Sequence, residues 1–175
     1  MTVRVAFLRG INVGKAHRVP MAELRALATG LGLTDVATHL QSGNLLHSSE
    51  ADPEADRLRL AAALEEAFGF TVDVVVVEAD RLADLVAAHP FADGDPKRVH
   101  LGFAPGALPH GLRDELEALA REGERFEVRD DVLFADFGQG VHDSRAGNAL
   151  ARLVRPGFVT LRNLATVGAL VERSR

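Results

Sequence analysis

Residues 3–15 read VRVAFLRGINVGK, an apolar, β-branched run that leads directly into a loop with glycines at positions 10 and 14. The run predicts a buried first strand over Met1–Arg9. The loop invites comparison with a phosphate-binding P-loop, in which backbone N–H groups surround the phosphates of a nucleotide. The elements that follow along the chain decide whether that comparison holds.

The next residues complete a β-α-β-β-α-β-α order. Pro20 suits the first turn of an amphipathic helix. Two short strands, Val36–Leu40 and Asn44–Ser48, flank a hairpin turn at Ser42-Gly43. The remaining elements expected in this half are a helix from Asp52 to Gly69, a strand over Thr71–Val77 and a helix over Asp80–His89.

The same order recurs after an acidic, proline-containing linker at Ala92–Pro96. We therefore expect an α+β fold of two ferredoxin-like units, residues 1–90 and 97–175, each with an antiparallel four-stranded sheet and helices packed on one face. The elements expected in the second unit are strand Arg98–Phe103, helix Leu112–Ala120, strands Arg125–Arg129 and Val132–Phe137, helix Ser144–Val154, strand Phe158–Leu161 and helix Asn163–Arg173.

The composition limits the class of protein. The chain has 175 residues, of which 47% are hydrophobic, and it contains no cysteine. No stretch approaches the roughly 20 apolar residues that span a bilayer, and the N-terminus lacks the apolar core of a signal peptide. We therefore expect a cytoplasmic protein without disulfides. The net charge of −5 argues against a nucleic-acid coat, which needs a broad basic face.

The P-loop interpretation fails on spacing and on topology. Gly10 and Gly14 enclose three residues where the P-loop pattern needs four, and Ala16 stands where a hydroxyl should reach magnesium. Val74–Val77 followed by Glu78 resembles a Walker B strand. In a β-α-β-β-α-β unit, however, Gly10 and Glu78 lie at opposite ends of the sheet. We expect no magnesium-dependent hydrolysis of ATP or GTP.

The same topology brings two polar segments together, because the loop after the first strand and the turn between the second and third strands lie at one end of the sheet. Cations, side-chain amides and glycine backbone suit an anionic or phosphorylated ligand. The plainer alternative is two ordinary glycine turns with solvated charges. The candidate binding residues are Arg9, Asn12, Gly14, Lys15, Gln41, Ser42 and Asn44, with His17 as a further candidate.

Four motifs resemble the bacterial domain-of-unknown-function 1697 family: LRGINVGK at 8–15, MAEL at 21–24, QSGN at 41–44 and TLRN at 160–163. The resemblance implies a duplicated ferredoxin-like fold in a small cytoplasmic bacterial protein, with no established activity. It adds Arg162 and Asn163 as candidate binding residues. The chain departs from the family in having Leu164-Ala165-Thr166 in place of Trp-Asn-Thr, and Ser144-Arg145 in place of Ser-Lys.

The remaining chemistry is sparse. No nucleophile–base pair, metal-ligand spacing or cofactor motif can be read, so the sequence assigns no catalytic residue, metal or cofactor and no oligomeric state. The hairpin allows His39 and His47 to face each other, and such an arrangement favours a hydrogen-bonded structural pair over a metal site. Three functions stay open: a module that binds an anionic small molecule, a transferase or hydrolase acting on such a ligand, and an RNA-associated protein. The charge and the lack of tryptophan and tyrosine weaken the third.

Overall fold

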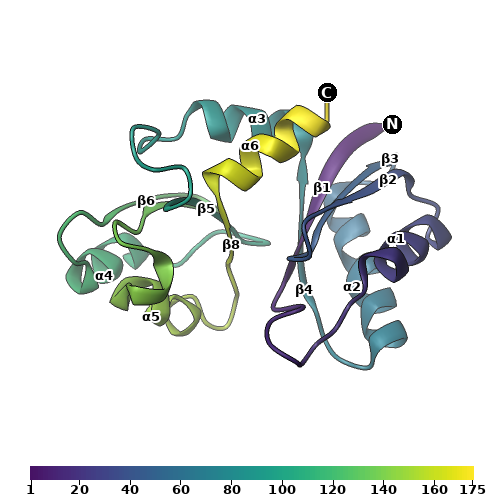
Figure 1. Ribbon diagram of the computed structural model, residues 1–175, viewed down its shortest axis with the longest axis horizontal. Helices are drawn as coiled ribbons and strands as arrows, with labels where there is room; N and C mark the ends of the chain where they lie inside the picture. Colours follow the sequence, from purple (N-terminus) through teal and green to yellow (C-terminus); the bar gives the residue numbers. More distant parts are fainter. The chain divides into compact units, whose positions relative to one another are not determined.

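The computed structural model describes residues 1–175 and contains two four-stranded antiparallel sheets (Figure 1). Their strand orders are β2-β3-β1-β4 and β6-β7-β5-β8, the same arrangement used twice. This is the ferredoxin-like topology. The predicted α+β fold with a repeated β-α-β-β-α-β unit is therefore confirmed.

The chain divides into two compact units, unit 1 (Met1–Ala83 with Leu170–Arg175) and unit 2 (Asp84–Ala169). The sequence-based division into 1–90 and 97–175 stays a prediction. The elements of the first half are β1 (Thr2–Arg9), α1 (Met21–Gly30), β2 (Thr34–His39), β3 (Asn44–Ser49), α2 (Pro53–Phe68), β4 (Asp73–Glu78) and α3 (Ala79–Ala87). Those of the second half are β5 (Val99–Phe103), α4 (Leu112–Leu119), β6 (Arg125–Arg129), β7 (Val132–Asp136), the 3-10 turn η1 (Val141–Asp143), α5 (Arg145–Leu153), β8 (Thr160–Asn163) and α6 (Leu164–Arg173).

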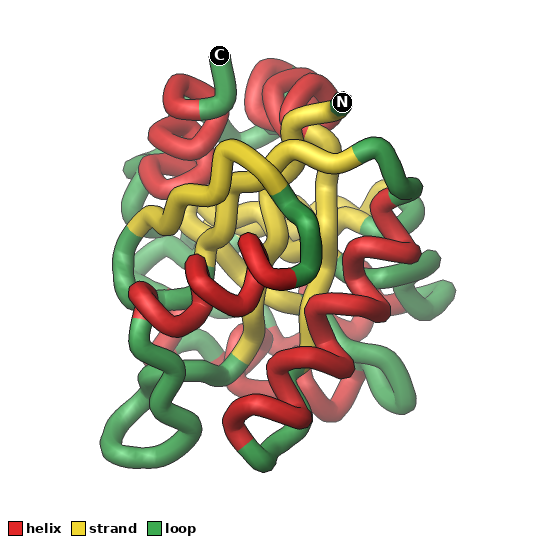
Figure 2. Tube along the Cα trace, turned by 90° about the vertical axis from the view of Figure 1, so that its right-hand side faces the viewer, coloured by secondary structure: helices red, strands yellow, loops and turns green.

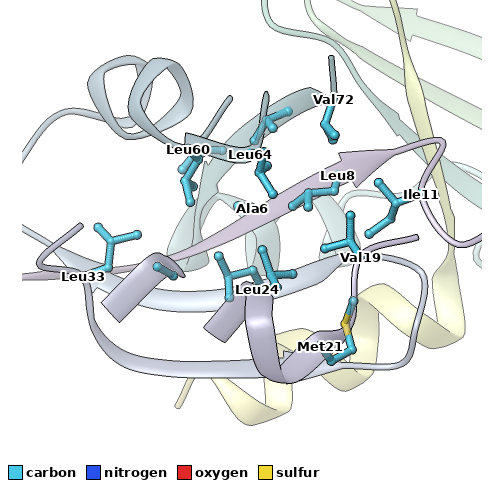
Figure 3. Close-up of a cluster of buried hydrophobic side chains, with 14 residues drawn as sticks. Ala6, Leu8, Ile11, Val19, Met21, Leu24, Leu33, Leu60, Leu64 and Val72 are labelled. Carbon is cyan, nitrogen blue, oxygen red and sulfur yellow. The ribbon is translucent and has the colours of Figure 1, made fainter. Parts of the chain in front are cut away.

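Helices α1 and α2 cover one face of the first sheet, and Figure 2 shows them in front of the strands. Alternate residues of β1 point to this side, where Ala6 and Leu8 are buried. Leu24 of α1 and Leu60 and Leu64 of α2 close on the same apolar cluster (Figure 3). The core therefore holds β1 in a fixed position, and the loop that leaves its C-terminal end starts from a rigid strand.

The ends of α2 follow from its flanking residues. Asp52 caps the helix by accepting a hydrogen bond from the backbone N–H of Ala55 at 2.8 Å. Gly69 ends it in the left-handed conformation, with a φ of 76°. Both boundaries agree with the sequence-based prediction.

The pairing of β1 with β4 separates the two segments that resemble Walker motifs. The strands are antiparallel, with Arg4 opposite Glu78 and Arg9 opposite Asp73. Glu78 thus lies beside the start of β1, whereas Gly10 follows its end. The predicted separation of Gly10 from Glu78 is confirmed.

Several element boundaries differ from the sequence-based predictions by one or two residues, and a residue pairing also differs. The last strand was expected at Phe158–Leu161, but β8 covers Thr160–Asn163 because β5 pairs from Phe103 with Thr160 to His100 with Asn163. His39 and His47 do not face each other, since His39 pairs with Asn44 and His47 pairs with Arg4. No helix is both long enough and apolar enough to cross a membrane.

Candidate functional site

The loop after β1 is closed by one side chain, that of Asn12. Its Nδ2 donates to the carbonyl oxygen of Val19 at 2.9 Å, and its Oδ1 accepts from the Val19 N–H at 2.9 Å. The Asn12 backbone N–H also donates to the His17 carbonyl oxygen at 3.0 Å. Asn12 has a positive φ of 55°, which asparagine tolerates better than most residues. The segment between Asn12 and Val19 is therefore a closed loop with a defined base.

The same side chain joins the loop to the hairpin turn between β2 and β3. Asn12 Nδ2 donates to the Gln41 carbonyl oxygen at 2.8 Å. A second link runs from the Leu8 N–H to the Gly43 carbonyl oxygen, also at 2.8 Å. The structure thus brings the LRGINVGK and QSGN motifs together. We call this contact, between residues 8–19 and 41–44, the N-terminal junction.

Gly43 allows the turn to lie this close. Its φ is 83°, and a Cβ on it would stand 2.8 Å from Leu8 Cβ and 2.9 Å from Ile11 Cδ1. Real Cβ atoms do not approach other carbons so closely. The glycine of QSGN is therefore required by packing and by backbone conformation together.

The tip of the closed loop carries cations that the protein itself does not neutralise. Lys15 and Arg18 are exposed and form no ion pair. The ring of His17 stacks on that of Phe70, with 4.5 Å between centroids, so the loop is also held from its other side. Arg9 differs from these residues, because its Nη1 donates to Asp73 Oδ2 at 2.8 Å. Lys15 and Arg18 are thus the cations most readily offered to an anion.

The polar residues of the turn divide into buried and exposed. Asn44 is fully buried, and its Nδ2 donates to the His39 carbonyl oxygen at 2.9 Å and to Ser42 Oγ at 3.1 Å. Gln41 and Ser42 are exposed beside the loop. The Asn44 amide thus stabilises the hairpin, while Gln41 and Ser42 face the solvent.

Apolar side chains border the same surface. Val13 is 72% exposed and Leu40 is 56% exposed. Each neighbours one end of the Asn12–Gln41 hydrogen bond in sequence. The junction therefore offers two solvent-exposed apolar groups as well as charge.

The C-terminal candidates, Arg162 and Asn163, belong to unit 2. Arg162 Nη1 donates to Thr160 Oγ1 and to the Leu161 carbonyl oxygen, each at 2.9 Å. Burial lowers the pKa of the Arg162 guanidinium to about 10, which leaves it charged at neutral pH. Asn163 caps α6, since its Oδ1 accepts from the Thr166 N–H at 2.8 Å. Their contribution to a binding site stays a prediction.

Sequence reasoning missed a buried polar cluster at the other end of β1. Arg4 Nη1 donates to Asp56 Oδ2 at 2.5 Å, and Ser49 Oγ donates to Asp56 Oδ1 at 3.0 Å. His47 Nε2 lies 3.3 Å from Asp56 Oδ2. Arg4 shares its side of β1 with Ala6 and Leu8, so an arginine in that apolar row signals a buried partner. The sequence does not show that the partner is Asp56, 52 residues away.

The cluster has the residue types of a hydrolase triad but not its geometry. In a triad the histidine stands between serine and aspartate, whereas here Asp56 stands between Ser49 and His47. Burial lowers the pKa of His47, and its Nδ1, like Arg4 Nε, is buried without a partner. No group of three or more histidine, aspartate or glutamate side chains suits a metal ion. The arrangement holds β1, β3 and α2 together.

Comparison with known proteins agrees with this architecture. A family described as "Protein of unknown function (DUF1697)" matches residues 1–134. Among solved structures, the chain is similar to the conserved bacterial protein SP0830 from Streptococcus pneumoniae, with a TM-score of 0.76, 21% sequence identity and 99% of both chains covered. At that identity the likeness concerns the fold. No curated protein matches the chain.

Proposed function

The chain belongs to the DUF1697 family of proteins of unknown function, and from that premise we propose that it binds an anionic or phosphorylated small molecule at the N-terminal junction. The proposed site is formed by the segments Arg9–Lys15 and Gln41–Asn44. A bacterial, cytoplasmic setting for this activity is part of the same proposal.

The observation that carries the proposal is the Asn12–Gln41 hydrogen bond of 2.8 Å. It fixes the base of the loop that carries Lys15 and Arg18 to the turn that carries the exposed residues Gln41 and Ser42. A preformed loop does not have to be ordered when the ligand arrives, which lowers the entropic cost of binding. Asn12 and Asn44 support the site, whereas Lys15 contacts the anion as a point charge.

Arg9 has a more constrained role. Its guanidinium is held by Asp73, and both side chains are about two-fifths exposed, at 38% and 37%. A ligand anion at this position shares the guanidinium with Asp73. Removing Arg9 therefore weakens binding less than removing Lys15.

Calorimetric titration with pyrophosphate tests the proposal. Lys15→Ala should weaken binding by about 1–3 kcal/mol, as expected for a hydrogen bond to a charged group. Lys97→Ala is the matched control, since Lys97 is the other exposed lysine of the chain and lies in unit 2. Binding should also weaken as salt is added. Equal affinities in the two variants would remove Lys15 and the junction from the binding site.

A further inference from the structure

Unit 2 contains a counterpart of the N-terminal junction, and the strand registers locate it. Phe7–Asn44 is the last pair between β1 and β3, and Phe103–Val132 is the last pair between β5 and β7. The next link is also the same in both units. The Leu8 N–H donates to Gly43 O at 2.8 Å, and the Ala104 N–H donates to Asp131 O at 3.0 Å.

The second link is made differently. Four residues after Ala104, the backbone N–H of Leu108 donates to the Asp130 carbonyl oxygen at 2.8 Å. In unit 1 the side chain of Asn12, four residues after Leu8, ties the loop to the turn instead, and its acceptor is Gln41, one residue further from the strand. We call the contact between residues 104–113 and 128–132 the C-terminal junction. In unit 2 a backbone hydrogen bond from Leu108 thus takes the place of the side-chain hydrogen bond that Asn12 makes in unit 1, and the loop is bonded to the turn in both units.

The C-terminal junction borders a pocket of about 350 Å³ that is open to solvent. That volume lies within the range of small-molecule sites. Much of its wall is apolar, supplied by Leu108, Pro109, Leu112 and Val128. Such a wall suits the hydrocarbon part of a small ligand.

One ionised group on the pocket wall has no ion-pair partner within the protein. Arg113 lines the pocket, but its Nε donates to Glu117 Oε1 at 2.9 Å. Beside the turn, Arg129 is paired with Glu127. Asp130 also lines the pocket; it is exposed to solvent, and its carboxylate has no hydrogen-bond or ion-pair partner within the protein. The unpaired charge is therefore negative, the opposite of Lys15 in unit 1.

We propose that the pocket of the C-terminal junction is a second binding site, which takes a small organic amine. The ammonium group pairs with the Asp130 carboxylate, and the hydrocarbon part packs on Leu108, Pro109 and Val128. This site is independent of the anion site in unit 1 and uses none of its residues.

A competing explanation is that Asp130 is present only because its backbone conformation in the turn favours aspartate or asparagine. Its φ is 52°, a left-handed conformation in which aspartate and asparagine are favoured over most residues. Asp130→Asn separates the two explanations, because asparagine keeps the turn preference and removes the charge. Asp114→Asn is the matched control, an exposed aspartate of α4 that does not line the pocket.

The test is a titration of the ¹⁵N-labelled full-length protein with n-butylamine, followed through its amide resonances. Neutral 1-butanol and anionic butyrate serve as ligands of similar size. We expect n-butylamine to shift the resonances of residues 107–113 and 128–131 selectively. We expect Asp130→Asn to weaken binding on the order of tenfold, the loss of one charge-assisted hydrogen bond. Asp114→Asn should bind as the wild type does.

Three results would overturn the proposal. The first is equal binding of 1-butanol or butyrate at the same residues. The second is unchanged n-butylamine affinity in Asp130→Asn. The third is a wild-type spectrum in which n-butylamine leaves residues 107–113 and 128–131 unmoved.

Discussion

In both junctions the loop after the central strand is hydrogen-bonded to the neighbouring hairpin turn, but different groups form the bond. In unit 1 a side chain, Asn12, ties the loop to the turn, and the turn needs a glycine at position 43. In unit 2 the backbone of Leu108 ties the loop, and Asp131 occupies the position of Gly43. A side-chain link frees the backbone of residues 13–18 to form an exposed loop. In unit 1 the tied loop itself carries the exposed cations Lys15 and Arg18.

The other end of each central strand shows a parallel contrast. By register, Arg4 with its partner His47 corresponds to His100 with its partner Ala135. The polar cluster of unit 1 is replaced in unit 2 by His100 against the ring of Phe137, with 5.2 Å between centroids. Unit 1 therefore contains a buried ion pair at one end of its sheet and exposed charges at the other.

The largest effect should come from breaking that ion pair. Arg4→Leu leaves the Asp56 carboxylate buried without its guanidinium partner, which costs about 3–5 kcal/mol of unfolding free energy. His100→Leu, at the equivalent position of unit 2, should cost less because it strands no buried charge. Urea unfolding of both variants measures the difference. Equal losses would show that the Arg4–Asp56 pair is not a special feature of unit 1.

The next effect concerns the turn. Gly43→Ala forces a Cβ against Leu8 and Ile11 at a positive φ, and we expect a loss of about 2–3 kcal/mol. Asp131→Ala changes a residue that already has a Cβ at the equivalent place and should cost less. Thermal unfolding compares the two variants. A Gly43→Ala protein as stable as Asp131→Ala would mean that the first turn can move away from the loop.

A smaller effect is expected at the side-chain link. Asn12→Ala removes the bonds to Val19 and Gln41 and should destabilise unit 1 by about 1–2 kcal/mol, because water replaces part of what is lost. It should also increase hydrogen exchange at residues 13–19. Asn12→Asp is the control, since it keeps the Oδ1 acceptor for the Val19 N–H and loses both donated bonds. Unchanged exchange in Asn12→Ala would contradict the role of Asn12 as the closure of the loop.

The smallest effect is on the pH dependence of stability. Burial lowers the pKa values of His47 and His100 below the ordinary 6.5, so folding favours their neutral forms. Their contribution is complete above about pH 6.5 and is lost as the pH falls below it. Asp56 partly offsets the effect at His47. Thermal unfolding from pH 7.5 to 5.5 should therefore show a smaller loss of stability with acid in His47→Gln and in His100→Gln than in the wild type.

The sequence predicts the architecture well because the architecture rests on local patterns. Asp52 and Gly69 mark the ends of α2, and the repeated element order leads to two ferredoxin-like sheets. The meeting of the two motifs follows from topology alone. The position of β8 was missed by two residues, since Asn163 ends that strand as the cap of α6.

The roles of single polar residues could not be predicted in the same way. Asn12 and Asn44 have the composition of ligand-binding residues, but their amides bond to the protein's own backbone. The partner of Arg4 comes from a helix packed on the sheet, and no local pattern specifies it. The Asp130 carboxylate likewise lacks an ion-pair partner because Arg113 pairs with Glu117 and Arg129 pairs with Glu127.

The most direct test of the central claim, that the N-terminal junction is an anion site, is a ¹⁵N–¹H titration of the wild-type protein with inorganic phosphate. We expect resonance shifts concentrated in residues 13–18 and 41–43, and their loss in Lys15→Ala but not in Lys97→Ala. Shifts spread over the chain, or shifts at the junction that persist in Lys15→Ala, would contradict the account.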